Sequence, residues 1–224
     1  MNGAKTLNIL NGQAMYDSFM QHHVDENNVY APFNEAMCVG EVYKDIFSSR
    51  FNQYRCHALN ITIEQYTELV LNPLQPLFNH QFTEIVLWFD DDMFCQINLL
   101  TLLAYLDQRH FNRKITFNLV NHGFKFINRF EFGVQGYHEA YQQVLIKKCL
   151  PQNIQIPVME QGIKLYLEYI KDENELTAYI RQYKNIPANI LVGQLFKVFP
   201  QYGLGDHQYF HLIEKCRISN GQAE

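Results

Sequence analysis

Short apolar runs alternate with longer stretches of helical periodicity along the first half of the chain. The runs at residues 6–10, 28–31, 84–89 and 114–120 predict strands. Between them, apolar residues recur at helical spacing at residues 14–21, 62–72 and 93–108, and Thr62 and Gln65 fit the capping box that begins a helix. Because strand, helix and strand in succession favour right-handed parallel crossovers, the pattern predicts an α/β fold, an open, mainly parallel, Rossmann-like sheet with flanking helices on both sides.

The strand signals end by Gly136, and the remainder of the chain has helical patterns at residues 137–148, 158–170, 172–183, 188–199 and 206–216. Asp172 and Glu175 predict a capping box at residue 172, Pro187 fits the first turn of the next helix, and Pro200 ends that helix. We therefore expect a sheet domain at residues 1–136 and a helical C-terminal region at residues 137–224. Residues 34–57 show no pattern from which a helix or strand can be placed.

The composition predicts a large hydrophobic core. Hydrophobic residues make up 47% and aromatic residues 14% of the 224 residues. The longest apolar runs fall well short of the roughly 20 residues that span a bilayer, so no membrane segment is predicted. The first residues lack the segments of a secretion signal, and the five scattered cysteines form neither a disulfide framework nor a paired zinc-ligand spacing. These features predict a cytoplasmic protein.

The charge argues against nucleic acid as a partner. A formal net charge of −5 offers no general attraction to a phosphate backbone. The last two predicted helices have the outline of a helix-turn-helix, but acidic and basic residues balance in the tail, which favours ordinary helix packing. The sequence neither predicts nor excludes a homodimer, because a dimer surface need not differ in overall polarity from other surfaces.

Candidate chemistry lies where the predicted strands end. Asn11, Gly12 and Gln13 join the first strand to a helix, where free backbone N–H groups can bind an anion; alternatively, Gly12 simply permits a tight turn. Asp90 and Asp91 follow the third strand and are candidate ligands for Mg²⁺, with Asp91 also a candidate base; alternatively, their charges stabilise the positive end of the helix that follows.

Several neighbouring residues have a structural alternative. Asp92 is placed to cap the helix that starts at Met93. Cys95 lies in the first turn of that helix between apolar residues and is expected to be buried. Glu35 and Glu41 are candidate catalytic carboxylates that can pair with Arg50 or Arg55, or be solvated loop charges.

Several of these stretches together resemble the bacterial family called domain of unknown function 1835. The similar segments are LNILNGQ at residues 7–13, APFNE at 31–35, GE at 40–41, LWFDDDMFCQ at 87–96 and FPQYGLG at 199–205. Members often have Gly-Asp-Ser where this chain has Gly12, Gln13 and Ala14. The resemblance implies no activity, but it groups residues that are expected to face one cleft: Asn11, Glu35, Glu41, Trp88, Asp91 and Gln96.

The leading hypothesis for function is a small-molecule or nucleotide-like ligand bound at the carboxyl edge of the sheet, with Mg²⁺-assisted hydrolysis as its enzymatic form. Gly12, Gln13, Trp88 and Gln96 are the expected ligand contacts together with Asn11. The alternative hypothesis is a regulatory or scaffolding protein whose helical tail binds protein or nucleic acid.

Overall fold

Five strands form one sheet at the centre of the computed structural model, which describes residues 6–22, 25, 27–79, 82–113 and 115–220, the last two for the backbone only. The strand order is β2-β1-β3-β4-β5, and the first four strands are parallel. Their bounds are β1 Thr6–Asn11, β2 Val29–Phe33, β3 Glu84–Asp90, β4 Ile115–Val120 and β5 Phe126–Phe132. The predicted α/β class with an open, mainly parallel sheet is confirmed.

Two strands differ from the prediction. Strand β2 continues beyond Ala31 to Phe33 and includes Pro32, which the edge position of β2 permits because one side of an edge strand needs no N–H donors. Strand β5 was not predicted at all. It runs antiparallel to β4 after the turn at residues 121–125. Lys114, the first residue of the predicted fourth strand, lies outside the described residues.

Helices fill the connections and the C-terminal part of the chain. The first half contains α1 Gln13–His22, α2 Ser49–Leu59, α3 Ile63–Tyr66 with the π-helical turn Thr67–Leu71, α4 Gln75–Phe78 and α5 Met93–Gln108. The second half contains α6 Tyr137–Tyr141 with the π-helical turn Gln142–Ile146, α7 Pro157–Tyr169, α8 Glu175–Gln182, α9 Ala188–Val198, a 3-10 turn Pro200–Tyr202 and α10 Asp206–Asn220. Among the described helices, none combines the length and apolar character that crossing a membrane requires.

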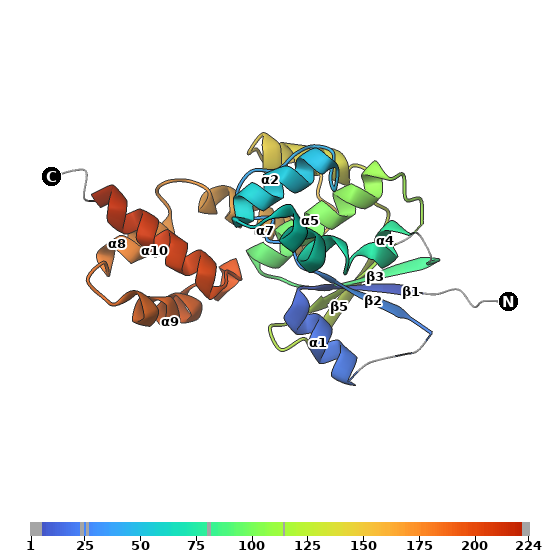
Figure 1. Ribbon diagram of the computed structural model, residues 1–224, viewed down its shortest axis with the longest axis horizontal. Coiled ribbons are helices and arrows are strands. Elements are labelled where there is room, and N and C mark those ends of the chain that lie inside the picture. The colour runs from blue at the N-terminus through green and yellow to red at the C-terminus, as the bar shows by residue number, and fades with distance from the viewer. Residues whose placement is uncertain (1–5, 23–24, 26, 80–81, 114, 221–224) are drawn as a thin grey trace.

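The winding of the chain reverses at β1. The connection through α1 leads from β1 to β2, and the next one, which contains α2 to α4, returns across β1 to β3. The connection through α5 continues in that direction to β4, so right-handed crossovers place α1 on one face of the sheet and α2 to α5 on the other. Figure 1 shows α1 on one face and α2, α4, α5 and α7 on the other. The carboxyl ends of β1 and β3, neighbours in the sheet, therefore form the crevice in which doubly wound sheets bind ligands.

The main core lies on the α5 face of the sheet. Leu7 and Ile9 of β1 point into it, whereas Leu10 belongs to a smaller cluster under α1. Helix α5 is buried from Cys95 to Leu106 without interruption, because it lies between the sheet and the helices α6 and α7. The hydrophobic core is thus continuous across the predicted boundary at residue 136.

The caps of two helices in the C-terminal region, α8 and α9, differ from the predicted ones. Asn174 and Thr177, rather than Asp172 and Glu175, form the capping box of α8. Both Asp and Asn are good N-caps, and the structure uses the one whose N3 position carries a hydroxyl group. Pro187 is the N-cap residue of α9 and not part of its first turn, and α9 ends at Val198, two residues before Pro200.

Candidate functional site

The candidate site begins where β3 ends. Asp90 is the last residue of β3, paired with Val120 at the end of β4. The chain leaves both strands in the same direction, so the turn after β3 and the hairpin after β4 meet at the carboxyl edge. This geometry brings Asp90 and Asp91 beside His122, although 30 or more positions separate them in sequence.

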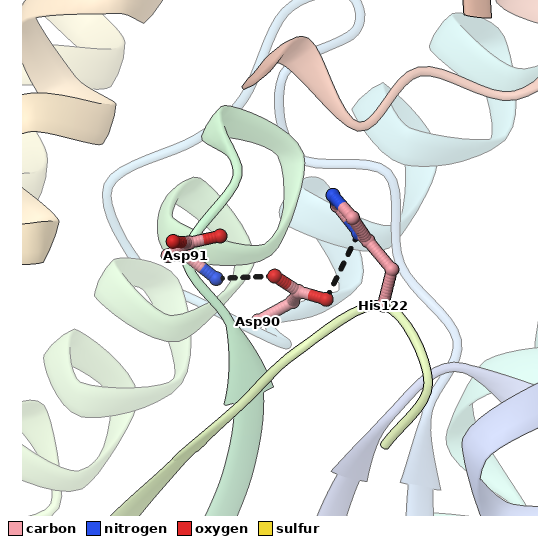
Figure 2. Close-up of side chains that lie close together, drawn as sticks. All are labelled: Asp90, Asp91 and His122. Atoms are coloured by element: carbon pink, nitrogen blue, oxygen red, sulfur yellow. Dashed lines mark hydrogen bonds and ion pairs between the residues drawn. The ribbon is translucent and has the colours of Figure 1, made fainter. Parts of the chain in front are cut away.

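Asp90, Asp91 and His122 each offer one ligand atom, and these atoms lie within 4.8 Å of one another. The Nδ1 atom of His122 lies 3.0 Å from Oδ2 of Asp90. The other carboxylate oxygen of Asp90 accepts a hydrogen bond of 2.7 Å from the backbone N–H of Asp91. Figure 2 shows the Asp90 carboxylate lying between these two partners. Asp90 is buried, whereas Asp91 and His122 are exposed, so the cluster opens to solvent on one side.

The electrostatics of this cluster favour a cation. Burial, followed by contact with the Asp91 carboxylate and the field of Asp92, raises the pKa of Asp90 to about 7. A proton therefore competes with a cation for the Asp90 carboxylate near neutral pH. A metal cation bound there would offset the same accumulation of negative charge.

Asp92 belongs to the helix and not to the cluster. Its Oδ1 accepts the backbone N–H of Cys95 at 2.7 Å, which confirms the predicted N-cap of α5. The turn after the 3-10 helix of the tail covers it: Gly203 has a φ of +63°, and a Cβ atom there would overlap the Asp92 carboxylate. Only glycine fits this close approach.

Cys95 is buried, as predicted. Burial, and then the nearby Asp92 carboxylate, raises the pKa of the Cys95 thiol. The protonated thiol donates to Oδ2 of Asp92 at 3.2 Å and accepts from the Asn11 amide at 2.8 Å. It has the environment of a structural cysteine and not of a nucleophile.

Asn11 reaches Glu35 through one further amide. Asn98 of α5 donates to Oδ1 of Asn11 at 2.9 Å and to the backbone oxygen of Glu35 at 2.7 Å. Its own Oδ1 accepts the backbone N–H of Met37 at 2.9 Å. Asn11 and Glu35, which the resemblance groups in one cleft, are therefore neighbours, but they are connected through the buried side chain of Asn98, and Asn11 itself is half-buried.

The Glu35 side chain ends in a buried ion pair. One carboxylate oxygen accepts from Arg55 at 3.0 Å, the other accepts from the hydroxyl group of Tyr66 at 2.5 Å, and Arg55 is fully buried. Burial, with a smaller contribution from this carboxylate, raises the pKa of Tyr66, so the phenol stays a donor. Arg55 also donates to the backbone oxygens of Ala36 and Val39, and thereby fixes the irregular segment 34–48.

The other predicted site residues lie apart from the cluster. Glu41 is exposed beside α2, so it does not share a pocket with the carboxylate of Glu35. The N–H of Gly12 is used by the backbone oxygen of Phe33, and Gln13 donates to Asp17 and accepts from Asn34. Gln96 is buried on the α5 face; its amide nitrogen donates to the backbone oxygen of Asp90, while its oxygen is buried without a hydrogen-bond partner within the described part of the chain.

Trp88 lies on the opposite face of the sheet, under α1. Its indole N–H donates to Oδ1 of Asn8 at 3.0 Å, and its ring packs edge-on against Phe19 with centroids 4.8 Å apart. Trp88 and Gln96 are therefore separated by the sheet. Trp88 instead lines a cavity, and residues of the hairpin that carries His122 form another part of the wall of this cavity.

The comparison with known proteins gives no further guide to this site. No protein-family model matches the chain, and no curated protein matches it.

Proposed function

We propose that the protein binds a divalent metal ion at Asp90, Asp91 and His122 and uses it to hold a small-molecule ligand at the carboxyl edge of the sheet. The observation that carries the proposal is the approach of three ligand atoms to within 4.8 Å where β3 and β4 end, next to the crevice between the carboxyl ends of β1 and β3. Donor atoms around a bound zinc ion are about 3.3 Å apart. Small rotations of the exposed Asp91 and His122 side chains would close this difference.

The donor set favours a transition metal over Mg²⁺. Two carboxylates and one imidazole supply two oxygens and one nitrogen. Mg²⁺ prefers oxygen ligands alone, whereas Mn²⁺, Fe²⁺ and Zn²⁺ accept imidazole nitrogen. Three protein ligands leave coordination positions for water or for an anionic group of the ligand, and a metal-bound water is the nucleophile that hydrolysis would need.

Calorimetric titration with MnCl₂ tests the metal site directly. We expect one Mn²⁺ site in the unmodified protein and a loss of affinity of about 10-fold or more in His122→Ala, because one of three ligands is removed. His122 is exposed, so the substitution leaves the core intact. His57→Ala removes an exposed histidine from α2 and is the matched control. Equal Mn²⁺ affinity in His122→Ala and the unmodified protein would refute the proposal.

A second candidate function is protein binding through the tail. Large apolar side chains are exposed on α9 and α10: Ile190, Phe196, Val198, Phe210 and Ile218. A contiguous exposed apolar patch marks an interaction site, and these side chains supply the apolar surface that such a patch on α9 and α10 needs. A second copy of the chain is the partner that can be tested with the protein alone.

Light scattering over a range of protein concentrations tests the second candidate. If α9 and α10 form a homodimer contact, the mass should approach that of two chains, and Phe196→Ser with Val198→Ser should return it to one chain. Leu69→Ser removes an exposed apolar side chain from the π-helical turn and should leave the mass unchanged. A single-chain mass at every concentration would exclude the homodimer.

A further inference from the structure

A cavity of about 730 Å³ lies on the α1 face of the sheet, between α1, the strands β1 and β3, and the hairpin 121–125. This volume is within the range of roughly 300 to 1,000 Å³ found for small-molecule sites. The cavity adjoins the metal-ligand cluster. Trp88, in its wall, precedes Asp90 by two residues on the same face of β3, and Gly123 follows His122 directly.

The wall of the cavity is rich in aromatic rings. Phe19, Tyr30, Trp88, Phe124 and Phe126 line it from α1, three strands and the hairpin. Trp88 is only partly buried, although it packs against the edge of Phe19. Its indole therefore keeps accessible surface in the cavity, against which a planar ring can stack.

Asn8 supplies a directed polar group in this apolar surrounding. It lies in the middle of β1 and is 6% exposed. An indole N–H can only donate, so the bond from Trp88 fixes the Asn8 amide with its oxygen toward the indole and its NH₂ group away from it. Within the described residues Trp88 is the only hydrogen-bond partner of the Asn8 side chain, which leaves that NH₂ group for an acceptor in the cavity.

We propose that this cavity binds the base of a nucleoside or nucleotide. Stacking on Trp88 and a hydrogen bond from Asn8 suit a planar heteroaromatic ring with acceptor atoms, and Lys125 at the cavity wall places a positive charge near an anionic substituent. A nucleotide bound in this way would direct its phosphate to the metal ion, and only this placement of the phosphate rests on the function proposed above. Binding of the base itself needs no metal.

The single tryptophan makes the cavity directly observable, since Trp88 is the only one in the chain. Adenosine is the probe and is titrated up to millimolar concentration in the presence of EDTA, with ribose as the ring-free control. We expect saturable quenching of the Trp88 emission by adenosine and no change with ribose. Adenosine should also raise the melting temperature of the protein.

Two phenylalanine substitutions on α1 locate the binding. Ser18 lines the cavity, so Ser18→Phe should fill it and weaken adenosine binding by about 10-fold to 100-fold, the loss associated with one base stacking contact. Gln21→Phe places the same side chain on the exposed surface of α1, outside the cavity lining, and should bind as the unmodified protein does.

The outcome separates this inference from the metal proposal. Absence of saturable quenching by adenosine, or equal affinity in Ser18→Phe and Gln21→Phe, would overturn the base site while leaving Mn²⁺ binding to His122 untouched. Adenosine binding with the expected loss in Ser18→Phe would support the base site even if Mn²⁺ does not bind. Tighter binding of naphthalene sulfonate than of adenosine would assign the cavity to an apolar ligand and also overturn the inference.

Discussion

Replacing Arg55 by leucine should lower the free energy of unfolding by about 3 to 5 kcal/mol, which is the usual cost of removing one partner from a buried ion pair. The substitution leaves the Glu35 carboxylate buried without its cation, and it removes the donors for the backbone oxygens of Ala36 and Val39. Denaturant unfolding followed by circular dichroism measures the change. A domain with a total stability of about 5 to 15 kcal/mol would come close to unfolding.

Two further variants keep this test decisive if Arg55→Leu does not fold. Tyr66→Phe removes one hydrogen bond to Glu35 and should cost about 1.5 to 3 kcal/mol, as hydrogen bonds to charged groups do. Gln53→Ala changes an exposed position of α2 and should stay within about 0.5 kcal/mol of the unmodified protein. If Arg55→Leu and Gln53→Ala had the same stability, the ion pair would not hold the segment 34–48.

Replacing Asp90 by asparagine should stabilise the protein above neutral pH. In the folded state the pKa of Asp90 is raised to about 7 from its ordinary value of 3.8, with burial as the main cause. The folded protein therefore binds this proton more tightly than the unfolded chain, and the stability it contributes is complete below about pH 4 and lost as the pH rises through about 7. Asparagine does not ionise, so the variant should be more stable at about pH 8 by about 2 kcal/mol or more.

Unfolding measured across this pH range tests the Asp90 prediction. The difference between Asp90→Asn and the unmodified protein should grow from about pH 4 to about pH 8. Glu84→Gln removes an exposed carboxylate from the start of the same strand and controls for the loss of one charge. A difference that stays constant with pH would show that Asp90 does not take up a proton on folding. A stabilised variant that no longer binds Mn²⁺ would mark Asp90 as a residue kept for binding at the expense of stability.

The sequence predicts those parts of the fold whose stabilising contacts are local. Helix α5 has the predicted bounds, since its periodicity, its Asp92 cap and the strand before it all lie within one short stretch. The capping box of Thr62 and Gln65 is also confirmed. Strand β5 carries a weaker signal: alternation of apolar and polar residues is limited to its end at Phe130 and Phe132, since Phe126 is followed by another apolar residue, Ile127. Most of the strand is exposed, and the turn before it contains an apolar residue, Phe124.

The candidate site depends on contacts that no local pattern contains. His122 follows β4 and lies more than 30 residues after Asp90 and Asp91, and only the pairing of β3 with β4 brings it to them. The segment 34–48 has no regular structure, and two of its carbonyl groups accept hydrogen bonds from the Arg55 side chain of α2, a contact that no local pattern predicts. The expected grouping of Asn11, Glu35 and Asp91 near one edge follows from strand order, but burial of Glu35 depends on a partner 20 residues away. The resemblance to domain of unknown function 1835 stays a prediction.

The position of α5 has a consequence for the order in which the chain can fold during synthesis. This helix is made before α6 and α7, yet these later helices complete the surroundings in which its residues 95–106 are buried. A nascent chain that has reached Gly136 has all five strands but leaves apolar side chains of α5 in water. We therefore expect the core to close after residues 137–169 have left the ribosome, with apolar side chains of α5 exposed to aggregation until then.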